Sequence, residues 1–140
     1  MIRLLAYLWA SPNSLIGLLL AVAGSRRQWR RGVLESTGGW LPRLLGHKIE
    51  AITLGHVILA CHADALDHWR DHERRHVRQY ERLGPLFLPA YFGLALYVAL
   101  RGRHPYRDHP LERQAGLFMP NQATKENSRE SLSGIGDHSD

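Results

Sequence analysis

The stretch from Glu50 to Leu83, EAITLGHVILACHADALDHWRDHERRHVRQYERL, decides the fold that we expect for this chain. Its first part, Glu50–Ala60, is rich in β-branched residues and predicts a strand, in which Gly55 indicates a bulge or a close approach of another backbone. Its second part, His62–Leu83, has apolar residues at spacings of three and four and predicts a helix that Gly84-Pro85 terminates. A strand that leads directly into a long amphipathic helix is the centre of the predicted α+β fold.

The predicted helix contains the pentapeptide His72-Glu73-Arg74-Arg75-His76, which has the pattern HExxH. Two histidines four residues apart lie about 40° apart around a helix axis, one turn above the other. Both imidazoles can then reach one zinc ion at the ~2.0–2.1 Å that zinc needs, while Glu73 is turned to one side, beside a zinc-activated water. The pattern therefore predicts His72 and His76 as metal ligands and Glu73 as a general base.

Two other interpretations of this helix stay open. His68 and His72 have the same spacing and form a second candidate ligand pair, but no glutamate follows His68 directly. The histidines can also belong to a solvated, charged helix face without a metal, an interpretation that the neighbouring arginines favour. These arginines are Arg70, Arg74, Arg75, Arg78 and Arg82.

A catalytic zinc ion needs a third protein ligand and an open position for water. The candidates downstream of the helix are Glu112, Asp108, His109 and His104. We prefer Glu112, because a helix that starts at Pro110, a residue favoured at the first helical position, would hold its carboxylate on a rigid element. The alternative for Glu112 is a capping-box carboxylate that bonds back to the cap residue.

Residues 1–24 form an apolar segment with one charge, Arg3, and are long enough to span a bilayer, which takes about 20 residues. Pro12 lies within the polar run Ser11–Ser14 and would kink or break a helix there. We expect a kinked transmembrane helix first, and a broken or interfacial helix pair second. A cleaved signal peptide is the third interpretation, because Ala21-Val22-Ala23 resembles a cleavage site.

Four arginines, Arg26, Arg27, Arg30 and Arg31, directly follow this apolar segment. By the positive-inside rule they predict a protein of the inner membrane whose folded domain lies on the cytoplasmic side. A second apolar run, Pro85–Leu100, is short for a span, so a re-entrant, interfacial or core helix is equally expected. The net charge of +5, with basic clusters next to apolar segments, predicts membrane lipids as partners and no binding of nucleic acid.

The 140 residues fit one domain, and parts of the chain are not expected to join its core. We expect a zincin-like domain over residues 25–115, with a short strand at Gly32–Thr37 and a turn at Gly38-Gly39. Trp40–Gly46 is expected to be an apolar connection. Residues 116–140 are rich in Asn, Ser, Gly, Lys and Glu and predict a disordered tail. The sheet is therefore expected to be small, a hairpin or little more.

Two motifs together suggest a family. HERRHVRQY at residues 72–80, followed by DHPLERQA at residues 108–115, resembles the gluzincin group of zinc metallopeptidases, which use HExxH and a glutamate on a downstream helix. More closely, Thr53–Ala115 is similar to short uncharacterised bacterial membrane proteins in which HExxH is followed by Gly-Pro and an apolar segment. The resemblance implies a peptide or protein substrate, zinc on three ligands, and a glutamate base. The ligands would be His72, His76 and Glu112, and the base would be Glu73.

The chain departs from the pattern of that group at one position. Asn or Asp is expected before Pro110 as a helix cap, and this chain has His109, a poorer cap. The placement of Glu112 depends on that cap. Tyr80 and Tyr106 are candidate hydrogen-bond donors to the oxyanion of peptide hydrolysis, although the spacing of Tyr80 is also typical of a core residue.

Three functions of different classes are compatible with these residues. The first is a membrane-associated, zinc-dependent metallopeptidase. The second is a module that keeps the metal site without turnover and binds a membrane or a partner. The third is a basic adaptor of the membrane surface that holds no metal. Loss of zinc in His72→Ala separates the first two from the third, and loss of proteolysis in Glu73→Gln separates the first from the second.

Overall fold

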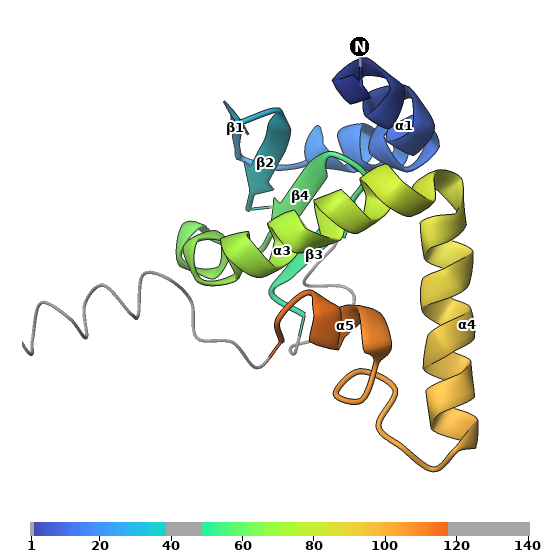
Figure 1. The fold of residues 1–140 in the computed structure, drawn as a ribbon. Coiled ribbons are helices and arrows are strands. Elements are labelled where there is room, and N and C mark those ends of the chain that lie inside the picture. The colour runs from blue at the N-terminus through green and yellow to red at the C-terminus, as the bar shows by residue number, and fades with distance from the viewer. Residues whose placement is uncertain (1, 39–48, 118–140) are drawn as a thin grey trace, which may run out of the picture.

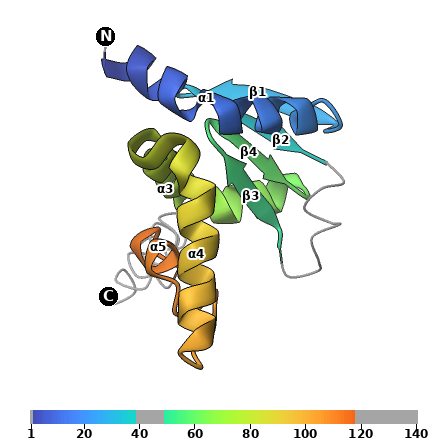
Figure 2. The same ribbon diagram turned by 90° about the vertical axis from the view of Figure 1, so that its right-hand side faces the viewer.

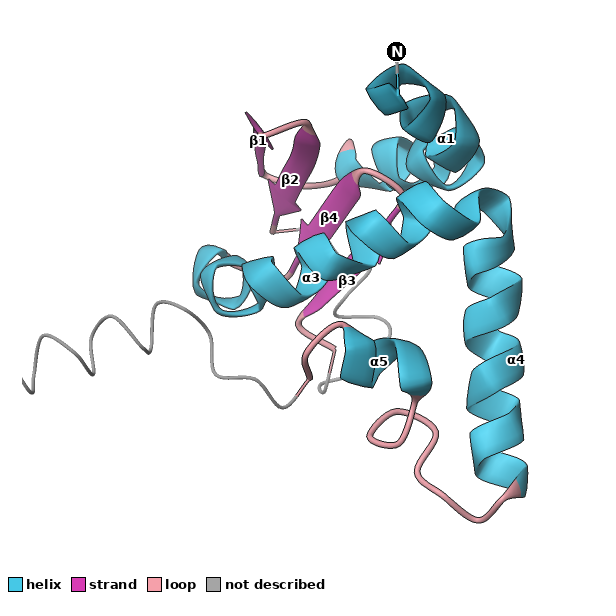
Figure 3. Cartoon of the chain, viewed as in Figure 1, coloured by secondary structure: helices cyan, strands magenta, loops and turns pink. Residues whose placement is uncertain are grey.

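The computed structural model describes residues 2–38 and 49–117 (Figures 1 and 3). It contains helices around a small sheet, which confirms the predicted α+β class. The expected connection at Trp40–Gly46 and nearly all of the expected disordered tail lie outside the described residues. The elements are α1 (Ile2–Ala21), β1 (Arg26–Arg30), β2 (Val33–Thr37), β3 (Ala51–Leu54), β4 (Val57–Ala60), α3 (Ala63–Leu83), η1 (Gly84–Leu86), α4 (Phe87–Leu100) and α5 (Pro110–Gln114).

The four strands form one sheet in the order β1-β2-β4-β3. Two antiparallel hairpins, β1-β2 and β3-β4, are joined by a parallel pairing between β2 and β4. The prediction of one strand over Glu50–Ala60 is wrong, because the chain reverses at Gly55-His56. Gly55 has φ 61°, and a side chain there would lie 2.2 Å from Ser14 Oγ, so the predicted close approach is real. Glycine at this position permits both the turn and its contact with α1.

Strand alternation divides the sheet into two faces, each covered by a helix. One face packs Val33 and Ile58 against Val77 of α3. The other face packs Val57 and Leu54 against the C-terminal end of α1. The molecule therefore has three layers, with the sheet between α1 and α3, and Figure 2 shows α1 running along one side of the strands.

The arginine cluster after the first apolar segment is not only a linker, because Arg26–Arg30 is the edge strand β1. Arg31 (φ 50°) and Gly32 (φ 79°) connect β1 to β2. Two consecutive positive φ values are typical of the type I′ turn, which is favoured in two-residue hairpins. The register pairs Gln28 with Glu35 and Arg30 with Val33. An arginine-rich strand lacks the usual strand signal, which explains why the sequence did not predict it.

Helix α1 is continuous through Pro12, so the interpretation as a broken helix pair is wrong. Proline has no N–H to bond the Leu8 carbonyl one turn earlier, and Ser11 Oγ donates to that carbonyl instead, at 2.7 Å. Asn13 is buried and its side chain donates to Gly84 O at 3.1 Å, while Ser14 Oγ accepts from His56 N at 3.0 Å. The polar run is therefore the place where α1 docks onto η1 and the β3-β4 turn.

Two helical stretches, Leu4–Ala21 and Ala63–Leu100, are long and apolar enough to cross a membrane, by length and composition. In the second stretch the apolar residues lie in η1 and α4, since α3 is strongly charged, and α4 turns away from α3 at η1 (Figure 1). Large apolar side chains are exposed on both α1 and α4, including Leu19 and Leu100. These features are consistent with association with a membrane.

Candidate metal centre

Helix α3 places different chemistry on its two flanks. At about 100° per residue, Leu66, Val77 and Tyr80 fall on the side that faces the sheet. Two pairs with a spacing of four residues lie on either side of this buried face. We call His72 and His76 the histidine flank, and Arg70 and Arg74 the arginine flank.

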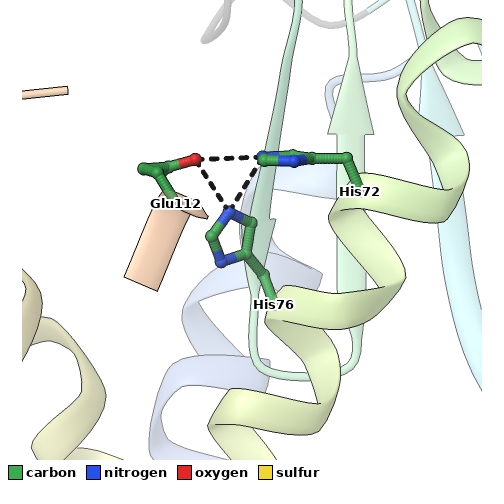
Figure 4. A group of neighbouring side chains, drawn as sticks. All are labelled: His72, His76 and Glu112. Carbon is green, nitrogen blue, oxygen red and sulfur yellow. Dashed lines mark hydrogen bonds and ion pairs between the residues drawn. The ribbon is translucent and has the colours of Figure 1, made fainter. Parts of the chain in front are cut away.

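The histidine flank meets Glu112 of α5 and forms a three-residue cluster, shown in Figure 4. His72 Nε2 lies 3.0 Å from Glu112 Oε2, and His76 Nε2 lies 3.3 Å from the same oxygen. The two imidazole Nε2 atoms lie 3.1 Å apart. All three residues are buried, with exposed fractions of 8%, 6% and 3% for His72, His76 and Glu112. Three lone-pair atoms therefore converge on one small, buried volume.

The size of this triangle fits a zinc ion. With Zn–N and Zn–O distances of roughly 2.0–2.2 Å, tetrahedral geometry separates neighbouring ligand atoms by about 3.3–3.5 Å. The longest edge, 3.3 Å, reaches this range, and the shortest, 3.0 Å, falls about 0.3 Å below its lower limit. Glu112 Oε2 is buried without a hydrogen bond of good geometry among the described residues, so a polar atom is left for a cation to satisfy. The residues fit the ion, and they form a cluster that could hold a metal.

His109 supplies the helix cap that the sequence had put in doubt. Its Nδ1 accepts the N–H of Leu111 at 3.2 Å, and its Nε2 lies 2.9 Å from the Tyr91 carbonyl oxygen. The prediction that histidine would cap poorly is wrong here, because an imidazole nitrogen replaces the Asn or Asp side-chain oxygen. Tyr91 of α4 stacks on the same ring, with centroids 4.2 Å apart, and its hydroxyl donates to Glu112 Oε1 at 2.5 Å. Glu112 Oε2 is thereby left facing the histidines.

Gln79 orients the second histidine. Its Nε2 donates to Leu111 O at 3.0 Å and to Gln114 Oε1 at 2.9 Å, so its Oε1 is left to accept from His76 Nδ1 at 2.8 Å. This assignment places the proton of His76 on Nδ1 and leaves the Nε2 lone pair directed at the cluster. Gln79 thus orients the ligand and joins α3 to α5 with the same side chain.

Glu73 lies beside the cluster and outside its triangle. Its exposed fraction is 6%, and Thr53 Oγ1 of β3 donates to its Oε2 at 2.6 Å. Burial raises the pKa of Glu73, and the nearby His76, the Thr53 hydroxyl and His72 offset only part of that rise. A raised pKa moves this carboxyl toward neutral pH, the direction that suits a general base.

The charges of the ligand residues are coupled. Burial opposes a charge on Glu112, but the adjacent imidazoles of His72 and His76 hold its pKa well below the usual range. Burial likewise lowers the pKa of His76, but Glu112 and Glu73 outweigh it and raise that pKa overall. The cluster therefore attracts positive charge, which either a proton or a metal ion can supply.

The other candidate ligands lie elsewhere. Asp108 accepts from the His104 backbone N–H at 3.0 Å, and His104 Nδ1 accepts from Tyr106 N and Arg107 N, so these side chains shape an exposed loop. His68 is exposed, contacts the edge of the Trp69 ring, and is not part of the cluster.

The two candidate oxyanion donors also differ in position. Tyr80 is fully buried and its hydroxyl donates to Thr53 O at 3.1 Å, which makes it a core residue. Tyr106, in contrast, is 42% exposed and is not a core residue.

The sequence reasoning missed three residues that support the cluster, namely Thr53, Gln79 and Tyr91. Gln79 could have been found, because it follows His76 by three residues and so shares its helix face. Tyr91 could not, since only the packing of α4 against α5 brings its hydroxyl to Glu112.

No family model, curated protein or solved structure matches this chain.

Proposed function

We propose that this protein is a membrane-associated, zinc-dependent metallopeptidase. The observation that carries the proposal is the convergence of His72, His76 and Glu112 in one buried cluster with Glu73 next to it. Two imidazole nitrogens and one carboxylate oxygen are a donor set that suits zinc. Three protein ligands are also the number typical of catalytic zinc sites.

Each side chain has a defined part in peptide hydrolysis. Zinc held by the cluster would polarise the scissile carbonyl and lower the pKa of a water molecule to near neutrality. Glu73 would accept the proton of the attacking water and deliver it to the leaving amine. Tyr91 and Gln79 would keep Glu112 and His76 oriented without touching the substrate.

The edge strand β3 offers a place for an extended peptide. Among the described residues it pairs as a strand only with β4. The carbonyl of the buried Thr53 already accepts from Tyr80, so a further strand would pair at the half-buried Ala51–Ile52 end of β3. Thr53 of β3 contacts Glu73 directly, which puts this edge beside the cluster. A substrate added as a strand would gain main-chain hydrogen bonds and pass the proposed base.

Placement in the inner membrane with the folded domain on the cytoplasmic side belongs to the same proposal. Its support is the position of four arginines, Arg26, Arg27, Arg30 and Arg31, directly after the apolar helix α1. Protease accessibility of the tail in intact inverted and right-side-out vesicles tests the orientation.

A metal-binding module without turnover is the second candidate. The observation that favours it is the short contact between Thr53 Oγ1 and Glu73 Oε2, which fixes one carboxylate oxygen in a structural hydrogen bond. In that case Glu73 would serve to support the site, and the cluster would bind metal for stability or for a partner.

The test compares metal content and proteolysis in four full-length proteins purified in detergent. They are the wild type, His72→Ala, Glu73→Gln and His68→Ala, the last being the control one turn earlier on the same helix. We expect about one zinc per chain by mass spectrometry, lost in His72→Ala and retained in the other two variants. Cleavage of a quenched fluorescent peptide library should disappear in both His72→Ala and Glu73→Gln.

Each other result has a clear meaning. Zinc retained together with wild-type proteolysis in Glu73→Gln would exclude Glu73 as the base. Zinc binding without cleavage in any of the proteins would favour the second candidate. Loss of zinc in His68→Ala would move the site to the His68/His72 pair. A wild type that binds no zinc even in excess metal would leave a basic membrane adaptor as the better account.

A further inference from the structure

A cleft lies between β1 and the first half of α3, with a volume of about 510 Å³. It borders the arginine flank, whereas the metal centre borders the histidine flank. Four arginines line it, together with two acids, Glu35 and Asp67. The arginines are Arg26, Arg27, Arg30 and Arg70.

The two acids are already neutralised by helix α3. Glu35 has an exposed fraction of 1% and accepts from Arg74 Nη2 at 2.8 Å and from Arg70 Nε at 3.3 Å. Asp67 forms an ion pair with Arg70 one turn away. The acids therefore have guanidinium partners that do not come from β1.

The arginines of β1 are left with unbalanced positive charge. Within the described residues, none of Arg26, Arg27 and Arg30 forms an ion pair with a carboxylate. Register places Arg26, Gln28 and Arg30 opposite Thr37, Glu35 and Val33, and Val33 packs toward α3. Because strand side chains alternate, Arg26 and Arg30 belong to the same face of the sheet, on the side of the cleft.

We propose that this cleft binds a phosphate-bearing anion, and that its ligand in the cell is the headgroup of an anionic phospholipid. Guanidinium groups bind phosphate oxygens with two parallel hydrogen bonds, and the lining of this cleft brings several of them together.

The position of the cleft favours a lipid as the source of the phosphate. Only residues 22–25 separate the end of the apolar helix α1 from the start of β1. Arginines at that place in a chain meet the headgroup layer when the apolar helix enters a bilayer. Trp29, on the opposite face of the same strand, is 65% exposed, and tryptophan is enriched at the boundary between acyl chains and water.

This proposal does not depend on the metallopeptidase proposal, because none of the cleft residues contacts His72, His76, Glu73 or Glu112 in the contacts described above. The far-ultraviolet circular dichroism spectrum reports whether a variant of the cleft is folded, without reference to the metal site. A protein that does not bind lipid would contradict the cleft proposal and leave the metal-site proposal unchanged. A protein that does not bind zinc would contradict only the metal-site proposal.

The test measures binding to the full chain in an uncharged detergent by isothermal calorimetry. The probes are dihexanoyl phosphatidylglycerol, dihexanoyl phosphatidylcholine and inorganic phosphate. The variant Arg26→Gln/Arg30→Gln removes two charges from the cleft. The control Arg101→Gln/Arg103→Gln removes the same charge from exposed positions after α4. The variant Arg26→Lys/Arg30→Lys keeps the charge and removes the planar, two-pronged geometry.

We expect phosphatidylglycerol to bind the wild type and the control alike, and to bind Arg26→Gln/Arg30→Gln at least about tenfold more weakly. The lysine variant should fall between the two. Inorganic phosphate that binds as well as the lipid, with the same loss in the glutamine variant, would support the anion site and assign it to free phosphate. Equal weakening in the control, equal binding of phosphatidylcholine, or no binding of either anion would overturn the proposal.

Discussion

The two flanks of α3 are built alike and differ in chemistry. On each flank, two side chains four residues apart converge on one buried glutamate from another element. The arginine flank binds Glu35 of β2, and the histidine flank faces Glu112 of α5. The exposed fractions of the two glutamates are 1% and 3%. The difference in chemistry between the two flanks therefore comes from the donors and not from the framework.

The arginine flank supplies hydrogen bonds to both carboxylate oxygens of Glu35, whereas the histidine flank leaves Glu112 Oε2 able to bind another ligand. Both oxygens of Glu35 accept hydrogen bonds, from Arg70, Arg74 and Gln28. A guanidinium is always charged and accepts no hydrogen bond, so this flank cannot bind a metal ion. Its ion pairs with Glu35 form a structural lock beside the cleft that Arg70 also lines. The imidazoles of His72 and His76 carry lone pairs that can coordinate a metal ion, so the histidine flank can take a further ligand.

Breaking the lock should give the largest effect. Glu35→Ala removes the buried carboxylate that Arg70 and Arg74 share, and leaves Arg70 with the exposed Asp67 and Arg74 with the Arg30 carbonyl. Loss of one member of a buried pair costs about 3–5 kcal/mol. We expect the free energy of unfolding of the metal-free protein to fall by that amount, measured by denaturant titration in detergent. Glu81→Ala is the control, because its ion pair with His56 is 40% exposed on the glutamate side and should contribute little. An unchanged stability in Glu35→Ala would contradict the assignment of a structural lock.

Removing the other glutamate should change metal binding more than folding. Structural zinc sites with four ligands bind with about 10–16 kcal/mol, so an even share for one ligand is about 2.5–4 kcal/mol, or roughly 10²–10³ in affinity. We expect Glu112→Gln to weaken zinc binding by that factor in competition with a chromogenic chelator. Asp108→Asn is the control, since Asp108 belongs to the exposed loop. Equal losses in both variants would show that general negative charge, and not the cluster, attracts the ion.

Loosening one support of the cluster should have a smaller effect. Tyr91→Phe removes the hydroxyl that donates to Glu112 Oε1 and keeps the ring that stacks on His109. Loss of such an outer partner weakens metal binding by about 10–100-fold, and we expect the lower end because the ring remains. Tyr97→Phe on the same helix, where the side chain is 52% exposed, should bind zinc like the wild type. A Tyr91→Phe variant with unchanged affinity would mean that α5 alone positions Glu112.

The histidine flank was more predictable from the sequence than the arginine flank. His72 and His76 meet through the geometry of a single helix, and Pro110 signalled the short helix that carries Glu112. These three residues come together as expected, while metal binding by them stays a prediction. The error at His109 arose because capping was judged by residue type, although an imidazole nitrogen can accept the same N–H.

The arginine flank depends on contacts that no local pattern encodes. Glu35 and Arg70 are 35 residues apart, and they meet only because β2 pairs with both β1 and β4. In the sequence, the arginines of β1 resembled a basic cluster that flanks a membrane helix. The same residues can both form the edge strand and flank the membrane. The hairpin turn at Gly55-His56 was missed because it lacks the Asn-Gly or Asp-Gly signal of tight turns.

The smallest expected effect concerns the hydroxyl next to the proposed base. The Thr53 hydroxyl stabilises the carboxylate form of Glu73 and so lowers its pKa, against the larger effect of burial, which raises it. Thr53→Val removes that hydrogen bond with little change in shape, so the pKa of Glu73 should rise further. A general base works in its deprotonated form, and activity is lost as the pH falls through its pKa. The acid limb of the pH–rate profile should therefore move to higher pH, while zinc content stays constant.

Thr37→Val on β2 is the matched control for this variant, because Thr37 is buried in the same sheet and has no contact with Glu73. A carboxyl-carbon NMR titration of Glu73 checks the same shift without reference to turnover. An upward shift of the Glu73 pKa in Thr53→Val but not in Thr37→Val would show that β3 lowers the pKa of the proposed base, in addition to lying beside the cluster. An acid limb and a carboxyl titration that are both unchanged would show that Thr53 only holds β3 against α3, which would make the histidine flank independent of the sheet edge beside it.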